Sequence, residues 1–194
     1  PRGTFSACDA SIIICQDDWS RCIHEYTRLK SLVLPEGLEC IGYGTFAHCE
    51  SLECINIPSA VKETDCDTFS GCARLKSLVL PERLECIGDS AFECCETREC
   101  INRPSAAKRI GREAFNRCAK LKSLVLPEGL ECIGDRAFAW CESLECITIP
   151  SGKSINAESF LLCNKLKYVS LPEGLEYIGD GELGTCMSLT HIDI

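Results

Sequence analysis

A repeat of about 23 residues runs through most of the chain and limits what it can fold into. Prolines mark it at a constant step, shorter by one position only at the end: Pro35, Pro58, Pro81, Pro104, Pro127, Pro150 and Pro172. One cysteine in each interval keeps the same spacing, at Cys49, Cys72, Cys95, Cys118, Cys141, Cys163 and Cys186. Self-similarity of this length is typical of arrays whose units contact only their neighbours. The sequence therefore predicts a solenoid.

A second period, twice as long, is superimposed on the first. The segment LKSLVLPEGLECIG at Leu29 returns almost intact at Leu75 and Leu121, and as LKYVSLPEGLEYIG at Leu166. Between these copies lies a second type of repeat, LECINIPS at Leu52 and LECITIPS at Leu144, with a divergent copy at Arg98. Two kinds of repeat thus alternate along the chain.

Each repeat is expected to form one coil. In the second repeat, Leu52, Ile55 and Ile57 alternate with polar positions, which predicts a short strand with one buried face that ends at the proline. The pair Leu130 and Ile133 predicts a second inward-facing arc. In the following segment, GDRAFAWC, Asp135 is expected to cap a short helical turn that buries Phe138. Stacked coils would bury a continuous core that no single coil could form.

The domain organisation follows from where the pattern holds. Residues 1–28 break the repeat and are interpreted as a degenerate N-terminal capping segment, because terminal repeats are usually atypical. Residues 29–194 are expected to form an array of about seven coils of roughly 22 or 23 residues each, truncated within a repeat at the C-terminus. Leu189, Ile192 and Ile194 begin a further strand whose open edge could mediate assembly.

Most of the 18 cysteines are explained by the repeat. The seven that keep the repeat spacing are expected to stack inside the coils as buried free thiols, since free cysteine packs as a small hydrophobic residue and their parallel Cβ directions disfavour disulfides. Two further series, one containing Cys54 and Cys146 and the other Cys40 and Cys86, occur in every second coil, roughly 10 Å apart. No C-x-x-C pair occurs and the three histidines are scattered, so no metal and no cofactor is expected.

The charges exclude some partners and leave others open. A net charge of −9 argues against nucleic acid, and no apolar run is long enough to predict a transmembrane segment. Lys30, Glu53 and Lys76 begin a series of alternating charges, read either as a device that sets strand register or as a polar rim for a partner. Acidic rows that begin at Glu36 and Glu39 are read as a solvated face or as a site for a basic partner.

No catalytic site is predicted. His48 beside Cys49 is the only adjacent cysteine–histidine pair, but Cys49 belongs to the buried series. A nucleophile needs a base within reach and a third group that orients the base. The glycines lie in Ile-Gly turns and Pro-Glu-Gly corners, where they serve backbone geometry. The chain is therefore not expected to be an enzyme.

The repeat unit LxxIxIPxxVxxIGxxAFxxCxxL resembles the BspA-like leucine-rich repeat, and the IGDxAFxxCxxL string is its most specific part. The resemblance implies an α/β-type solenoid, a right-handed arc with a parallel β-sheet on its concave face and short helical turns or loops on the convex side. It also implies adhesion and protein binding, often at cell surfaces, with no catalytic residues.

Two functions are therefore expected, and both are non-enzymatic. The first is a surface or adhesion protein that binds an unidentified protein partner through the concave face, with localisation at the cell surface or outside the cell. The second is a scaffolding subunit of a larger assembly, intracellular or organellar if the thiols are free. The residues expected to present the concave face are Ser31, Val33, Cys54, Asn56, Ser77, Val79, Asn102, Ser123, Val125, Cys146, Thr148, Tyr168 and Ser170.

Overall fold

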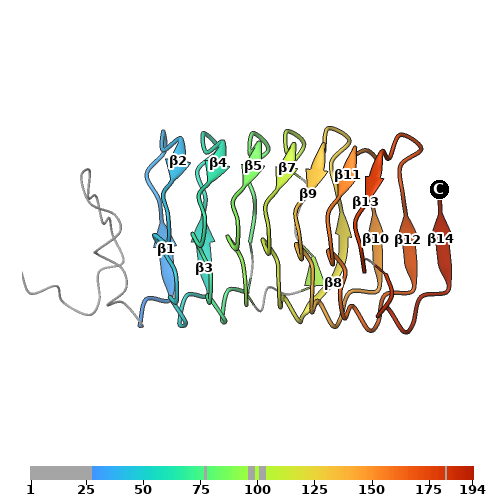
Figure 1. Cartoon of the computed structure of the whole chain (residues 1–194). Coiled ribbons are helices and arrows are strands. Elements are labelled where there is room, and N and C mark those ends of the chain that lie inside the picture. The colour runs from blue at the N-terminus through green and yellow to red at the C-terminus, as the bar shows by residue number, and fades with distance from the viewer. Residues whose placement is uncertain (1–27, 77, 96–98, 101–103, 182) are drawn as a thin grey trace, which may run out of the picture.

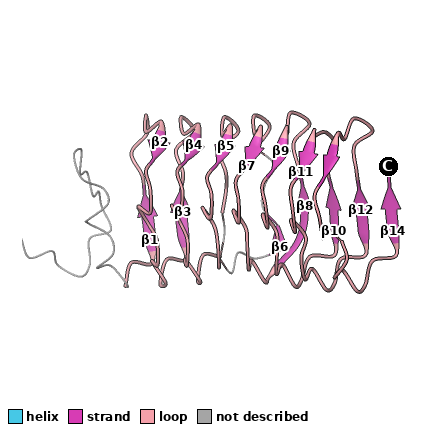
Figure 2. Cartoon of the chain, in the orientation of Figure 1, coloured by secondary structure: helices cyan, strands magenta, loops and turns pink. Residues whose placement is uncertain are grey.

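The chain winds into a row of stacked coils, and most coils add one strand to each of two parallel rows (Figures 1 and 2). The computed structural model describes residues 28–76, 78–95, 99–100, 104–181 and 183–194, with the backbone alone at 99–100. The first strand row contains β1 (Ser31–Val33), β3 (Cys54–Asn56), β6 (Glu99–Cys100), β8 (Leu121–Val125), β10 (Cys146–Thr148), β12 (Tyr168–Ser170) and β14 (His191–Asp193). The second strand row contains β2 (Cys40–Ile41), β4 (Glu63–Thr64), β5 (Cys86–Ile87), β7 (Arg109–Ile110), β9 (Cys132–Ile133), β11 (Ser154–Ile155) and β13 (Tyr177–Ile178). The third coil, counted from Leu29, contributes β5 to the second row, and its described residues 78–80 form no strand.

Every strand pairs in parallel with a strand of the neighbouring coil. In the first strand row, β1 pairs with β3, and β6, β8, β10, β12 and β14 form one five-stranded sheet. The second strand row is a single seven-stranded sheet from β2 to β13. The register follows the repeat, so that Cys146 pairs with Tyr168 and Ser154 with Tyr177. Equivalent residues of successive coils therefore lie side by side, about 4.8 Å apart.

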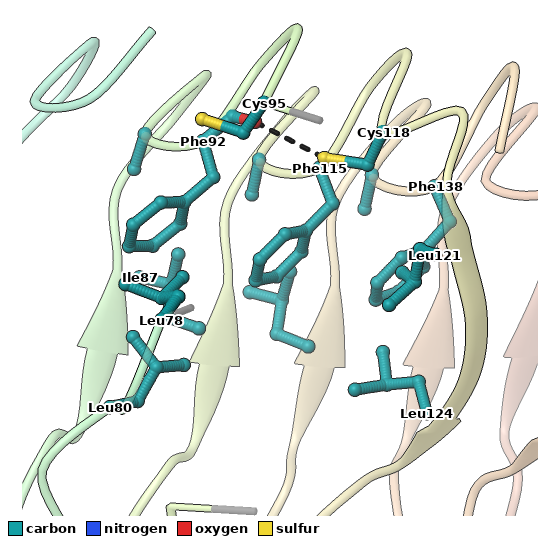
Figure 3. Packing of buried hydrophobic residues seen from close by; sticks show 14 of the residues in the cluster. Leu78, Leu80, Ile87, Phe92, Cys95, Phe115, Cys118, Leu121, Leu124 and Phe138 are labelled. Carbon is teal, nitrogen blue, oxygen red and sulfur yellow. Dashed lines mark hydrogen bonds between the residues drawn. The ribbon is translucent and has the colours of Figure 1, made fainter. Parts of the chain in front are cut away.

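The core lies between the two strand rows and the turn that closes each coil. Leu52 and Ile55 from the first row and Ile87 from the second are buried, as the alternating pattern predicts. A column of six phenylalanines, Phe46, Phe69, Phe92, Phe115, Phe138 and Phe160, fills the space beside the turns. Their rings stack with centroids 5.2 to 5.7 Å apart and interplanar angles of 4 to 10° (Figure 3). Each coil thus shares its aromatic contacts with its neighbours.

The seven cysteines that keep the repeat spacing are buried, as predicted, and form a column beside the phenylalanines. Each thiol after Cys49 donates a hydrogen bond to the phenylalanine carbonyl of the preceding coil. Cys118 Sγ, for example, lies 3.2 Å from the Phe92 carbonyl oxygen (Figure 3), and the other distances are 3.1 to 3.3 Å. No disulfide forms among the described cysteines. The column therefore links neighbouring coils through hydrogen bonds.

The predicted helical turn is wrong, and with it the α/β assignment, because the described residues contain no helix. In a helix, the N–H groups of the turn would bond within the coil. Here, alternate N–H groups donate to the next coil instead: Phe46 N lies 2.8 Å from the Thr68 carbonyl oxygen and His48 N lies 2.7 Å from that of Ser70. Two residues of a typical turn adopt positive φ, as at Arg136 (54°) and Trp140 (61°). The fold is a β-solenoid with turns on its third side.

The buried thiols predict how stability depends on pH. Burial raises the pKa of Cys49 to about 11 and that of Cys72, Cys118 and Cys163 to about 12, whereas an unfolded thiol titrates near 8.5. A group whose pKa is raised in the folded state stabilises fully below its unfolded pKa and loses that contribution as pH rises toward its folded pKa. We therefore expect the free energy of unfolding to fall by about 1.4 kcal/mol per pH unit for each such thiol above pH ~8.5.

The measurement is chemical denaturation at pH 7.5, 9 and 10, comparing the unaltered chain with a Cys95→Ala, Cys118→Ala variant. The variant should lose stability less steeply with pH, because two buried thiols are gone. Equal slopes for the two proteins would show that the cysteine column does not titrate on unfolding.

Candidate functional site

The outward side of the first strand row, here called the first face, is built by the alternation of each strand. In β1, Leu32 points into the core while Ser31 and Val33 point outward. Each coil therefore presents two outward positions on its strand and a charged residue just before them. Within β1 and β3, and within β8, β10 and β12, the strands pair in register, so these positions line up in columns there. Between β6 and β8 the register shifts at Glu99 and Cys100. The first face is consequently an exposed surface with a repeating pattern of side chains.

The structure exposes six of the eleven described residues predicted for the binding face. Val33, Val79 and Val125 are the most apolar of them, with exposed fractions of 64%, 65% and 49%. Cys54, Asn56 and Cys146 are exposed, and the half-buried members are Ser31, Ser123, Thr148, Tyr168 and Ser170. Ser77 and Asn102 lie outside the described residues. Ser31, Val33, Cys54 and Asn56 come from the paired strands β1 and β3. The members from Ser123 to Ser170 come from the paired strands β8, β10 and β12. Val79 lies between these two groups, in the described segment 78–80, which forms no strand.

Alternating charges border the first face as the sequence predicts. Lys76 Nζ lies 2.6 Å from Glu53 Oε2, and Lys167 Nζ lies 3.2 Å from Glu145 Oε2, each pair joining neighbouring coils. The hydrogen bond and charge of Lys76 lower the pKa of Glu53 below its ordinary value. We call the series Lys30, Glu53, Lys76, Glu99, Lys122, Glu145 and Lys167 the first charge column.

Polar aromatic side chains gather where the first face meets the last strand. Tyr168 Oη donates a 2.6 Å hydrogen bond to the Asp193 carboxylate, and its ring stacks on His191 with centroids 6.4 Å apart. The carboxylate raises the pKa of the Tyr168 hydroxyl. Val125 is exposed two strands away. This end of the face carries larger side chains than the Ser and Cys positions of the preceding coils.

The second strand row carries a matching column of charges, which the acidic-row interpretation missed. Glu39, Glu85, Glu131 and Glu176 do not form an acidic row, because Lys62, Lys108 and Lys153 occupy the coils between them. Lys62 lies 3.9 Å from Glu39 and Lys108 lies 3.4 Å from Glu85. We call this series of seven residues the second charge column. Its alternation favours the solvated, register-setting interpretation over a site for a basic partner.

A shallow depression of about 360 Å³ lies on the second strand row between the first three coils, lined by Glu39, Cys40, Lys62, Glu63, Glu85 and Cys86. Burial and the neighbouring Glu63 raise the pKa of the Cys40 thiol, which opposes formation of a thiolate. Within the described ranges, no three His, Cys, Asp or Glu side chains are placed to hold a metal ion. The depression offers neither an activated nucleophile nor a ligand set.

The adjacent pair His48 and Cys49 is separated by the fold. Cys49 is buried with its pKa raised by burial, whereas His48 is exposed at positive φ (58°) and lies over Gly71 of the next coil. The thiol therefore gains no thiolate character from its environment. Among the described residues, no helix is long and apolar enough to span a membrane.

An exposed tryptophan lies away from the first face and was not predicted as a site. Trp140 belongs to the turn of its coil and is 40% exposed, with the Arg117 guanidinium 5.6 Å from its ring centroid. The sequence signal was present, since Trp140 follows AFA where the other turns carry histidine, glycine, cysteine, arginine, leucine or threonine. Trp and Arg are enriched at interfaces, so the turn side also offers an anchor.

Two rows of short parallel strands, inward leucines and isoleucines, and one coil for each sequence repeat define a leucine-rich repeat solenoid. The family model of the BspA type leucine rich repeat region matches residues 3–106 and 87–194, in six copies. The chain belongs to the BspA-type leucine-rich repeat family.

Two solved structures are similar to the chain. A leucine-rich repeat protein from Bacteroides ovatus is 33% identical with a TM-score of 0.75, over 85% of this chain and 45% of that one. The Treponema pallidum leucine-rich repeat protein TpLRR is 30% identical with a TM-score of 0.78, over 82% of this chain and 78% of that one. The chain thus spans less than half of the Bacteroides ovatus protein. No curated protein sequence matches it significantly.

Proposed function

We propose that the chain is a non-enzymatic module that binds another protein through its first face, as part of a surface or adhesion protein. The observation that carries this proposal is the solvent exposure of Val33, Val79 and Val125 at equivalent positions of the first, third and fifth coils. These valines contribute nothing to the core, and polar or small residues separate them on the alternate strands. An apolar group at every second coil gives a partner a place to bury its own apolar side chains.

The small side chains of the first face support the same surface. Small residues such as Ser31 and Ser123 at the middle positions would let the backbone of a partner approach closely.

The composition of the face predicts the strength of binding. Its described positions contain one tyrosine and no tryptophan or arginine, the residues that usually dominate binding energy. A single face should therefore bind weakly, and several copies presented together would bind through avidity. Tyr168 at the C-terminal end is the strongest candidate for an anchor, because its ring is held by Asp193 and His191.

Replacing Val79 or Val125 by Arg should abolish binding of the partner and leave the fold intact. Each side chain points to solvent, so the substitution adds a long charged group to the binding face without disturbing the core. The measurement is binding of the partner by surface plasmon resonance, with thermal unfolding as the check on folding. We expect a loss of at least tenfold in affinity and a change in stability within about 0.5 kcal/mol.

Met187→Arg provides the matched control, since it adds the same charge at an apolar residue that is 91% exposed and lies outside the first face. It should bind as the unaltered chain does. Ala substitutions at Ser123 or Asn56 should also have little effect, because these side chains are small. Unchanged binding by both valine variants would contradict the assignment of the first face.

A scaffolding subunit is the second candidate, favoured by the thiols. The described cysteines form no disulfide, which suits a reducing compartment. Under this alternative, the contacts lie on the end of the stack.

A further inference from the structure

The two charge columns run in opposite order along the stack. Numbering the coils from Leu29, odd coils carry Lys in the first charge column and Glu in the second, as Lys76 and Glu85 do in the third coil. Even coils carry the reverse, as Glu53 and Lys62 do in the second coil. This order holds for all seven coils. Each coil therefore has a positive and a negative edge, and the edges exchange places from one coil to the next.

Further charges follow the same rule. In odd coils, the residue two positions before the lysine of the first charge column is also basic: Arg28, Arg74, Lys120 and Lys165. In the even coils that begin at Leu52 and Leu144, the residue two positions before the leucine is acidic: Glu50 and Glu142. The effect of these neighbours is seen at the Glu53 carboxylate, whose pKa is lowered mainly by Lys76. Lys30 and Arg74, which also belong to the two adjacent odd coils, lower it further. An even coil thus lies between two coils of opposite charge order.

Ion pairs join coils at both edges. Across the first edge, Lys76 pairs with Glu53 and Lys167 with Glu145. Across the second edge, Lys62 pairs with Glu39 and Lys108 with Glu85. Each of these four ion pairs joins two neighbouring coils. The backbone hydrogen bonds and the phenylalanine and cysteine columns repeat from one contact between coils to the next, so they do not distinguish one coil from another.

We propose that the coil-to-coil surface is selective, and that the partner it accepts is a coil of the opposite charge order. This selection applies within the chain and also to a coil supplied by a second copy, as in strand exchange or stacking at an open end. If the stacking is displaced by one coil, two coils of the same charge order meet, and Lys lies beside Lys and Glu beside Glu at both edges. A displacement by two coils restores every ion pair. The unit of assembly is therefore two coils, or about 46 residues.

The difference in stability between a matched and a mismatched contact depends on how many ion pairs that contact contains. One exposed ion pair contributes little, and like charges opposite each other destabilise by a similar small amount. A mismatched contact, however, exchanges attraction for repulsion at both edges at once. Salt screens charges at the protein surface, with a Debye length of about 10 Å at 0.1 M ionic strength. The selection should therefore weaken as salt is added.

The test uses two variants of identical net charge in the whole chain. Glu53→Lys with Lys62→Glu reverses the second coil alone and creates two mismatched contacts, one on each side. Adding Lys30→Glu with Glu39→Lys also reverses the first coil, which restores the contact between coils one and two and leaves a single mismatch with coil three. Thermal unfolding of both variants and the unaltered chain is followed in 20 mM and 500 mM NaCl.

We expect the melting temperature to fall by about 5 °C for the two-substitution variant in low salt, and by about half as much for the four-substitution variant. The protein with more substitutions is thus expected to be the more stable of the two, and the difference should shrink by at least half in 500 mM NaCl. A four-substitution variant that melts at or below the two-substitution variant in low salt would overturn the proposal. So would a difference that does not respond to salt.

Discussion

Phe138→Ala should destabilise the chain by about 3–5 kcal/mol. Phe138 is fully buried, and its ring stacks on Phe115 at 5.5 Å and on Phe160 at 5.7 Å. Removing the ring leaves a cavity that a coil held on both sides by backbone hydrogen bonds cannot close. It also removes two stacking contacts, each contributing about 0.5–1.5 kcal/mol beyond area burial. Because repeat arrays depend on contacts between neighbours, the loss can split unfolding into two steps.

Chemical denaturation followed by circular dichroism measures this effect, and Trp140→Ala is the matched control. Trp140 is an aromatic residue of the same coil, but it lies at the surface. We expect it to change the free energy of unfolding by less than about 1 kcal/mol. Phe92→Ala should behave as Phe138→Ala does. A loss below about 1 kcal/mol for either phenylalanine would show that the ring is not in the core and that the coil register is wrong.

Gly134→Ala is expected to have the second largest effect, a loss of about 2–3 kcal/mol. A Cβ atom at this position would lie 2.6 Å from the Arg112 nitrogen and from the Gly111 carbonyl carbon of the preceding coil. Both contacts are with backbone, which is held in place because Gly134 N donates a 2.9 Å hydrogen bond to the Ile110 carbonyl. The methyl group can fit only if the two coils move apart.

Gly129→Ala provides the control, because a Cβ there would meet no heavy atom within 4 Å. That substitution should be neutral or slightly stabilising, since alanine restricts the unfolded chain. Both variants are compared by denaturant unfolding. Equal stability for the two would contradict the close approach of coils at Gly134.

Two coils carry a larger residue at the place equivalent to Gly134, namely Asp65 and Asn156. In these coils, Thr68 Oγ1 and Ser159 Oγ each donate to the carbonyl three residues before, at 2.6 Å, and lie 3.4 and 3.1 Å from a glycine carbonyl of the preceding coil. The coil of Gly134 has Ala137 at this place and lacks such a hydroxyl. Replacing Gly134 is therefore expected to destabilise its coil more than a side chain at position 65 or 156 destabilises the coils of Asp65 and Asn156.

The sequence predicted the parts of the fold that depend on burial with a fixed period. The inward leucines of the first strand row, the phenylalanine column and the buried cysteines each recur once per repeat, and burial of an apolar side chain is nearly independent of local backbone detail. The second strand row was expected only as an inward-facing arc. Its strands are two residues long, too short for alternation to be recognised, and they exist because neighbouring coils supply partners.

The turn was predicted wrongly for a related reason. AFxxC has the apolar spacing of one helical turn, but the next coil lies close enough to accept the N–H groups of Phe46 and His48. Intercoil bonds of this kind cannot be recognised within one repeat. The second charge column keeps the same spacing as the first and could have been recognised in the same way, but the acidic-row interpretation considered only every second coil, from Glu39 to Glu85, and passed over Lys62. For the candidate site, the pattern indicated which side chains point outward, whereas the identity of the partner depends on a surface outside the chain.

Site-specific photocrosslinking tests the central claim most directly. A photoreactive residue is placed in turn at Val79 or Val125 on the first face, at Trp140 on the turn side, and at Ile192 on the last strand, and each protein is exposed to the partner in its natural setting. We expect strong crosslinks from positions 79 and 125 and few from positions 140 and 192. Crosslinks confined to position 192, with positions 79 and 125 unreacted, would contradict the central claim and favour the scaffolding subunit.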